Sequence, residues 1–183
     1  MKVIMIRTKP DIHPDIVNWL TEGYIPTADS KIIPFLVHLD ALRQASASSA
    51  DCVIIIEDGT IIDPDFNNKI NAIVPKIPIE YDTCLLSHYV LTWDGLSFIN
   101  GTDKQLCSVN SGIIGSYAYW MRMKHVEHLL AMFDQPLRNI PQFNINPETL
   151  TRLGRVCMVH QPLIAKVTDV NQKKYFASYG FKV

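Results

Sequence analysis

Two adjacent carboxylates follow an unbroken apolar run in the segment "VIIIED", residues 53–58. Each residue of Val53–Ile56 is β-branched, and no polar residue alternates among them. Such a run predicts a strand that is covered on both faces, as in the middle of a parallel sheet. Acidic side chains at the carboxyl end of such a strand lie where open α/β sheets bind ligands. Because neighbouring carboxylates repel each other, Glu57 and Asp58 together predict a site for a divalent cation.

The composition is that of a soluble globular protein, with 48% hydrophobic residues, 19% charged residues and a net charge of −1. A length of 183 residues favours a single domain, residues 1–183. The sequence has no long basic run, which argues against nucleic acid as a partner. No apolar stretch approaches the roughly 20 residues of a membrane helix, so no integral membrane segment is expected. The opening residues, MKVIMIRTKP, are not expected to be a signal peptide, because charge and proline soon interrupt the short apolar stretch.

The four cysteines are widely spaced and sit in apolar surroundings: Cys52, Cys84, Cys107 and Cys157. This pattern favours buried, reduced thiols over a disulfide framework or a zinc site. Reduced thiols are typical of a cytoplasmic protein.

Strand and helix patterns alternate along the chain, which places it in the α/β class. Strands are predicted at residues 2–6, 53–57, 81–90, 106–116 and 155–167, the last as a strand pair. Helices are predicted at residues 14–22, 34–45, 65–74, 119–133 and near 147. A loop is expected at 92–105, and residues 171–183 sustain no helical or alternating period. We expect a Rossmann-type, mostly parallel sheet flanked by helices in a single domain.

The familiar phosphate-binding motifs are absent from the sequence. There is no glycine-rich dinucleotide fingerprint and no GxxxxGK[ST] loop. An α/β protein that lacks these glycines must hold a phosphorylated ligand by other means. A metal ion on acidic residues would do so, because it neutralises a diphosphate directly.

The segment "VIIIEDGTIIDPDF" resembles the signature of glycosyltransferase family 25, the lipooligosaccharide and collagen galactosyltransferase-like enzymes. That signature is an apolar strand, then Glu-Asp-Asp, then Pro-Asp-Phe. Upstream, "PFLVHLDALRQA" resembles the Ser-His helix of the family, with His38 in the histidine position and Val37 where serine is usual. Downstream, Tyr119 matches a tyrosine that precedes a helix, and "VNSGIIG" resembles the Asn-Ser-Gly strand of other GT-A glycosyltransferases. The similarity spans roughly residues 30–166.

This resemblance implies a GT-A-like fold and a glycosyltransferase of the hexosyltransferase type. Such an enzyme moves a sugar from a nucleoside-diphosphate sugar, with UDP as the first choice, to a hydroxyl group of a glycan or glycoprotein. The resemblance also implies Mn²⁺, or Mg²⁺, as a cofactor. Asp58 and His160 are the candidate metal ligands, since some GT-A enzymes supply a histidine from a late strand. Gly59 departs from the family pattern, which has a second aspartate there, so the metal site has one carboxylate ligand fewer than the pattern.

Several polar residues are candidates for binding the nucleotide sugar: Arg7, Thr8, His38, Glu57, Asp58, Asn110, Ser111 and Gly112. Arg7 and Thr8 end the first strand, where a GT-A fold receives the base and ribose. The Asn-Ser-Gly stretch offers hydrogen bonds to sugar hydroxyls, with glycine allowing a close approach of the backbone. Asp94 and Asp103 are the candidates for the base that takes the proton of the acceptor if the reaction inverts.

Several of these residues also have a purely structural interpretation. His38 fits a core histidine bonded to the backbone, His160 fits a histidine at a strand end, and the Asn-Ser-Gly stretch fits a turn. Asp63 and Asp65, on either side of Pro64, fit turn and helix-cap residues.

Two other classes of function stay open. A strand that ends in acidic residues also suits a metal-dependent phosphotransferase or nucleotidyltransferase. Gly59 in the acidic motif is compatible with a non-catalytic module that binds a nucleotide sugar or a glycan.

Overall fold

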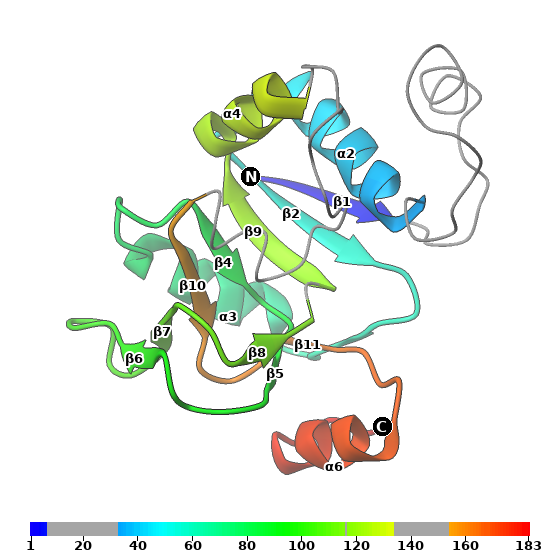
Figure 1. The fold of residues 1–183 in the computed structure, drawn as a ribbon, viewed down its shortest axis with the longest axis vertical. Helices are drawn as coiled ribbons and strands as arrows, with labels where there is room; N and C mark the ends of the chain where they lie inside the picture. The colour runs from blue at the N-terminus through cyan, green and yellow to red at the C-terminus, as the bar shows by residue number, and fades with distance from the viewer. Residues whose placement is uncertain (7–32, 116, 134–153) are drawn as a thin grey trace.

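The computed structural model of the protein describes residues 1–6, 33–115, 117–133 and 154–183 (Figure 1). Seven of the strands in these residues form the main sheet: β1 (Lys2–Ile6), β2 (Cys52–Glu57), β4 (Thr83–Leu85), β6 (Leu96–Phe98), β7 (Leu106–Val109), β9 (Ala118–Arg122) and β10 (Val156–Val159). Two small sheets pair β3 (Ile61–Ile62) with β11 (Ile164–Ala165), and β5 (Tyr89–Val90) with β8 (Ile113–Ile114). The helices are α2 (Ile33–Ser46), α3 (Phe66–Ile73), the 3₁₀ helix η1 (Val74–Lys76), α4 (Met123–Phe133) and α6 (Val170–Ser178).

The strand order of the main sheet is β1-β2-β9-β4-β10-β7-β6. β1 is parallel to β2, and β4 is parallel to β10, whereas β9 and β7 run against both of their neighbours. Five of the seven strands therefore run in one direction. The predicted α/β fold with a mostly parallel sheet is confirmed.

The acidic strand β2 is an interior strand, with β1 on one side and β9 on the other. Val53 and Ile55 belong to the core that α2 and α4 cover, while Ile54 and Ile56 belong to the core on the face that α3 covers. All four side chains are buried. This burial on both faces explains why the run carries no polar residue.

The helix predicted from Tyr119 begins only at Met123, which corrects the sequence-based boundary. Residues 118–122 instead form β9, which is hydrogen-bonded to β2 on one side and to β4 on the other. Tyr119 and Trp120 are buried on opposite faces of the sheet. Aromatic residues favour strands, and burial on both faces outweighs the helical pattern that continues into α4.

Two segments that were predicted as single strands are each interrupted. Residues 81–90 divide into β4 and β5, and residues 106–116 divide into β7 and β8. The second break falls at Asn110–Gly112, where Gly112 has a φ of 85°. The predicted loop at 92–105 also contains the edge strand β6. β5 and β8 leave the main sheet and pair with each other instead.

The last residues of the chain contain a helix, α6, that the sequence pattern did not predict. Asp169 caps it, because its Oδ1 accepts hydrogen bonds from the backbone N–H groups of Asn171 and Gln172. Phe176 is 1% exposed, and Tyr175 packs edge-on against Tyr89 of β5. α6 is thus held by a cap and by one buried aromatic residue.

Some expectations lie outside the described residues: the helices at 14–22 and near 147, and the site candidates Arg7 and Thr8. None of the helices in the described ranges has the length and apolar character needed to cross a membrane. The four cysteines are free thiols; Cys84, Cys107 and Cys157 are buried, as predicted, whereas Cys52 is only partly buried.

Replacement of Phe176 by alanine tests the docking of α6. We expect Phe176→Ala to lower the free energy of unfolding by about 3 kcal/mol, because it leaves a cavity in the core. Phe181→Ala is the matched control, since Phe181 is half-buried and touches Phe176 edge-on. Urea unfolding measures both changes, and an unchanged stability of Phe176→Ala would contradict the docking.

Candidate functional site

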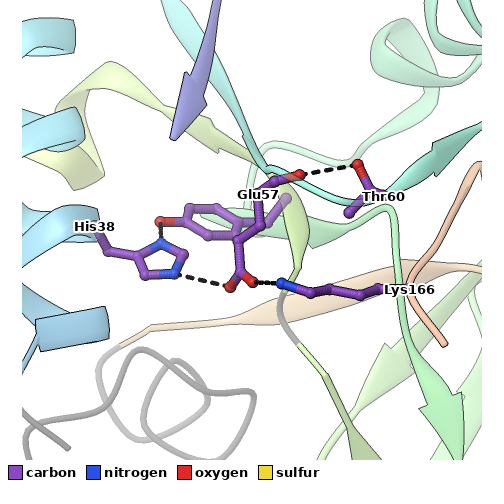
Figure 2. A network of polar contacts seen from close by, with 5 residues as sticks. His38, Glu57, Thr60 and Lys166 are labelled. Carbon is purple, nitrogen blue, oxygen red and sulfur yellow. Dashed lines mark hydrogen bonds and ion pairs between the residues drawn. The ribbon is translucent and has the colours of Figure 1, made fainter. Parts of the chain in front are cut away.

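A network of polar contacts surrounds Glu57 at the carboxyl end of β2 (Figure 2). Glu57 is only 8% exposed. Its Oε1 accepts a hydrogen bond from Nε2 of His38 at 3.1 Å, and its Oε2 lies 2.6 Å from Nζ of Lys166. Nδ1 of His38 lies 3.0 Å from the hydroxyl of Tyr119. We call His38, Glu57, Tyr119 and Lys166 the Glu57 cluster.

Each member of the Glu57 cluster is positioned by a different element. Tyr119 of β9 lies opposite Ile55 of β2, on the face of the sheet that α2 covers. α2 supplies His38. Lys166 directly follows β11, whose Ala165 pairs with Ile61 of β3. Since β3 begins four residues after Glu57, this pairing returns the lysine to the end of β2.

Protonation in the Glu57 cluster follows from what each group is able to donate. An ionised carboxylate only accepts hydrogen bonds, so Nε2 of His38 carries the proton toward Glu57. In the neutral imidazole, Nδ1 then accepts the hydrogen bond of the Tyr119 hydroxyl. Burial, together with the charge of Glu57, raises the pKa of Tyr119 well above its ordinary value. Tyr119 therefore remains a donor.

The pKa of Glu57 reflects opposing effects. Burial alone would raise it, but the hydrogen bonds from His38 and Lys166, together with the positive charge of Lys166, outweigh burial and lower the pKa from its ordinary value. Glu57 is therefore ionised at neutral pH. Its negative charge is stabilised by groups of the protein itself.

The turn after β2 is held mainly by the backbone. The N–H of Asp58 donates to the carbonyl of Ile6 at 2.8 Å, and the Thr60 hydroxyl donates to the carbonyl of Glu57 at 2.9 Å. Asp58 is half-buried. Gly59, which replaces the second aspartate of the family pattern, has a φ of 69°, and no atom would lie within 4 Å of a Cβ there.

Lys166 lies at the boundary between the buried carboxylate and solvent. Its side chain is 21% exposed, and its Nζ lies 5.1 Å from the centre of the Tyr117 ring. This lysine was not among the residues predicted for the site. The signal that indicates it is the apolar stretch "PLIAK", which ends in a charged residue just as the β2 run ends in Glu57.

The Asn-Ser-Gly stretch forms a turn against the loop that precedes β6. The Ser111 hydroxyl lies 3.4 Å from the carbonyl of Asp94, and the N–H of Asn110 donates to the carbonyl of Gly95 at 3.0 Å. A Cβ on Gly112 would lie 2.5 Å from the carbonyl oxygen of Thr92, so this close contact requires glycine. Asp94, Asn110 and Ser111 are exposed. The structure thus brings four predicted site residues together in one surface turn.

His160 follows β10 and lies in an aromatic group. Its ring centre is 5.8 Å from that of Trp93 and 5.0 Å from that of Phe98. Asp58 directly follows β2, which is three strand spacings from β10 in the sheet, or about 14 Å. The structure therefore does not bring Asp58 and His160, the predicted metal ligands, to one point. Nor do the described ranges contain a group of three His, Cys, Asp or Glu side chains able to hold a metal ion.

The other acidic candidates form local contacts. Asp103, with a φ of 51°, lies in the turn between β6 and β7, and its exposed carboxylate is 3.3 Å from Nζ of Lys76. Asp63 accepts a hydrogen bond from the N–H of Asp65 and forms an ion pair with Lys69 at 2.6 Å. The turn interpretation of Asp63 is confirmed. Asp65 occupies the N-cap position of α3 but makes no side-chain cap hydrogen bond.

Removal of the Tyr119 hydroxyl tests the network directly. We expect Tyr119→Phe to lower the free energy of unfolding by about 1–2 kcal/mol, because Nδ1 of the buried His38 loses its donor. Urea unfolding measures this loss. Tyr81→Phe, at a half-buried tyrosine outside the Glu57 cluster, is the control. Equal stability of the two variants would show that the hydroxyl contributes nothing.

Acid titration of stability tests the ionisation of Glu57. Its pKa in the folded protein lies below the ordinary value of 4.5, so on acidification the unfolded state takes up the proton first. The stability that Glu57 contributes is complete above about pH 4.5 and is lost as the pH falls through the lowered pKa. We expect Glu57→Gln to be less stable by about 1–3 kcal/mol at neutral pH and to lose less stability on acidification. The exposed Glu80→Gln is the control, and parallel pH curves for wild type and Glu57→Gln would contradict the assignment.

Two solved structures resemble the chain at low sequence identity. One is a crystal structure of a glycosyltransferase involved in the glycosylation of the major capsid of PBCV-1, with a TM-score of 0.48 and 8% identity over 98% of this chain and 99% of that chain. The other is HddC from Yersinia pseudotuberculosis, with a TM-score of 0.42 and 14% identity over 98% of this chain and 78% of that chain. No protein-family model matches the sequence, and no curated protein matches it. With TM-scores below 0.5, neither likeness assigns a function to this chain.

Proposed function

We propose that the protein is a glycosyltransferase of the hexosyltransferase type, which moves a sugar from a nucleoside-diphosphate sugar to a hydroxyl of a glycan or glycoprotein. One observation carries this proposal. Glu57, His38 and Tyr119 belong to three separate segments that resemble glycosyltransferase segments. In the folded protein the three side chains form one hydrogen-bonded network. Residues far apart in the sequence thus meet at the carboxyl end of an interior strand, where α/β sheets bind ligands.

The donor is proposed to bind along this edge of the sheet, with UDP as the first choice of nucleotide. Asp58 belongs to the same edge, because its N–H is tied to the end of β1. The exposed Asn110 and Ser111 provide hydrogen-bonding groups for the sugar and the acceptor. His38 and Glu57 bond to each other, so we assign them the role of holding the site in shape.

Transfer exchanges one bond at the anomeric carbon of the donor for another. The bond to the diphosphate oxygen breaks, the acceptor oxygen bonds to the carbon, and the acceptor proton passes to a base. We prefer Asp94 over Asp103 as that base, because Asp94 lies against the Asn-Ser-Gly turn whereas Asp103 is paired with Lys76. Mn²⁺ stays a prediction from the resemblance. The free cysteines favour a reducing compartment such as the cytoplasm.

Release of UDP from a panel of UDP-sugars, without any acceptor, tests this function. We expect slow donor hydrolysis, and we expect Asn110→Ala to lower kcat/KM by about tenfold, as for loss of one hydrogen bond to the substrate. The melting temperature should stay unchanged, because Asn110 is exposed. Asn68→Ala, at an exposed asparagine of α3, is the control. Binding of UDP-sugars without release of UDP would instead indicate a non-catalytic module.

A further inference from the structure

The carboxylate of Glu57 is neutralised from within the protein. One of its oxygens is bonded to His38, and the other lies 2.6 Å from the ammonium group of Lys166. Such a short distance is typical of a charge-assisted hydrogen bond. A metal ion that bound Glu57 would have to displace one of these partners.

The remaining predicted ligands do not fit a single metal ion. Gly59 has no side-chain oxygen, and Asp58 and His160 follow the ends of two strands that are about 14 Å apart. Mg²⁺ and Mn²⁺ prefer oxygen ligands, and Mg²⁺ at a phosphate site is usually held by one or two carboxylates together with the phosphates. With Glu57 already paired, the acidic motif offers at most Asp58, and the part of the chain that the structure describes holds no group of three acidic, histidine or cysteine side chains.

Lys166, beside Glu57 at the carboxyl end of β2, has the properties of a residue that binds phosphate. Its ammonium group has three N–H donors and uses one of them toward Glu57. The side chain is partly exposed beside Tyr117, at the carboxyl end of β2. Because His38 and Tyr119 fix Glu57, and Glu57 in turn holds the lysine, the positive charge is positioned before a ligand arrives.

We propose that Lys166 binds the diphosphate of the nucleotide sugar directly and supplies the positive charge that the resemblance assigns to manganese. This inference rests on the proposed function. As the bond between sugar and diphosphate breaks, negative charge grows on the leaving oxygen, and the fixed ammonium group stabilises it. The lysine keeps its own protons, so the step needs no further reactant.

Calorimetric titration of the wild-type protein with UDP and with uridine, each in EDTA and in Mn²⁺, tests the inference without any substitution. In EDTA, UDP should bind about 10- to 100-fold more tightly than uridine, the range for a hydrogen bond to a charged group. Binding of UDP that requires Mn²⁺ would overturn the inference and leave the proposed function standing. Failure of UDP and all UDP-sugars to bind under either condition would overturn both.

Three variants then separate a binding role of the lysine from a structural one. In EDTA, Lys166→Ala should lose about tenfold in UDP affinity and keep its affinity for uridine, while Lys166→Arg should retain most of the UDP affinity. Lys69→Ala is the matched control, because Lys69 also forms an ion pair at 2.6 Å, with Asp63. Unchanged UDP affinity in a folded Lys166→Ala protein would overturn the proposal.

A further control perturbs the network but keeps its charges. Tyr119→Phe should weaken UDP binding by less than Lys166→Ala does, because Glu57 and Lys166 keep their charges while the network that positions them loses one hydrogen bond. A loss equal to that of Lys166→Ala would show that the lysine acts only through the structure, which also overturns the proposal. If Lys166→Ala does not fold, the ratio of UDP to uridine affinity in EDTA, measured for the wild type and for Lys166→Arg, decides the question.

Discussion

A carboxylate that is almost entirely removed from water needs partners, and the burial of Glu57 imposes this constraint on the whole carboxyl edge of the sheet. His38 must come from the helix above it and Lys166 from the far end of the chain. The hydroxyl of Tyr119 then satisfies the second nitrogen of the histidine. The positions of α2, β9 and β11 relative to β2 are thus coupled through one side chain. The hydrogen bonds that stabilise the buried Glu57 therefore also form the candidate site.

The sequence predicted those parts of the structure that depend on local pattern. The β-branched run before Glu57 has only one good interpretation, a strand covered on both faces, and β2 is such a strand. The stretch that begins at Tyr119 has two interpretations, because its apolar residues fit both a buried strand and an amphipathic helix. Its first residues form a strand because β2 and β4 pair with them, and the local sequence does not show this pairing. Lys166 was missed for a related reason, since its partner Glu57 is 109 residues away in the sequence.

Two groups of side chains belong to the proposed site, and they differ in burial and charge. The Glu57 cluster is buried, charged and held by side-chain hydrogen bonds. The Asn-Ser-Gly turn is exposed and contacts Asp94. Trp93, the residue before Asp94, packs its ring against that of His160. A rigid charged group suits the fixed diphosphate of a donor, whereas an exposed polar and aromatic surface suits a larger acceptor. The two groups therefore fit a division of roles between donor and acceptor.

The position of β9 between β2 and β4 has a consequence for the order in which the sheet assembles. During synthesis, β1, α2 and β2 emerge first, yet the open side of β2 waits for residues 118–122, which emerge about sixty residues later. Until then, Ile54 and Ile55 present a bare apolar strand edge, and such edges pair readily with other chains. Pairing over this sequence separation is slow, because the entropy of closing a long loop must be overcome first. The edge of β2 is therefore exposed to pairing with other chains until β9 has been synthesised.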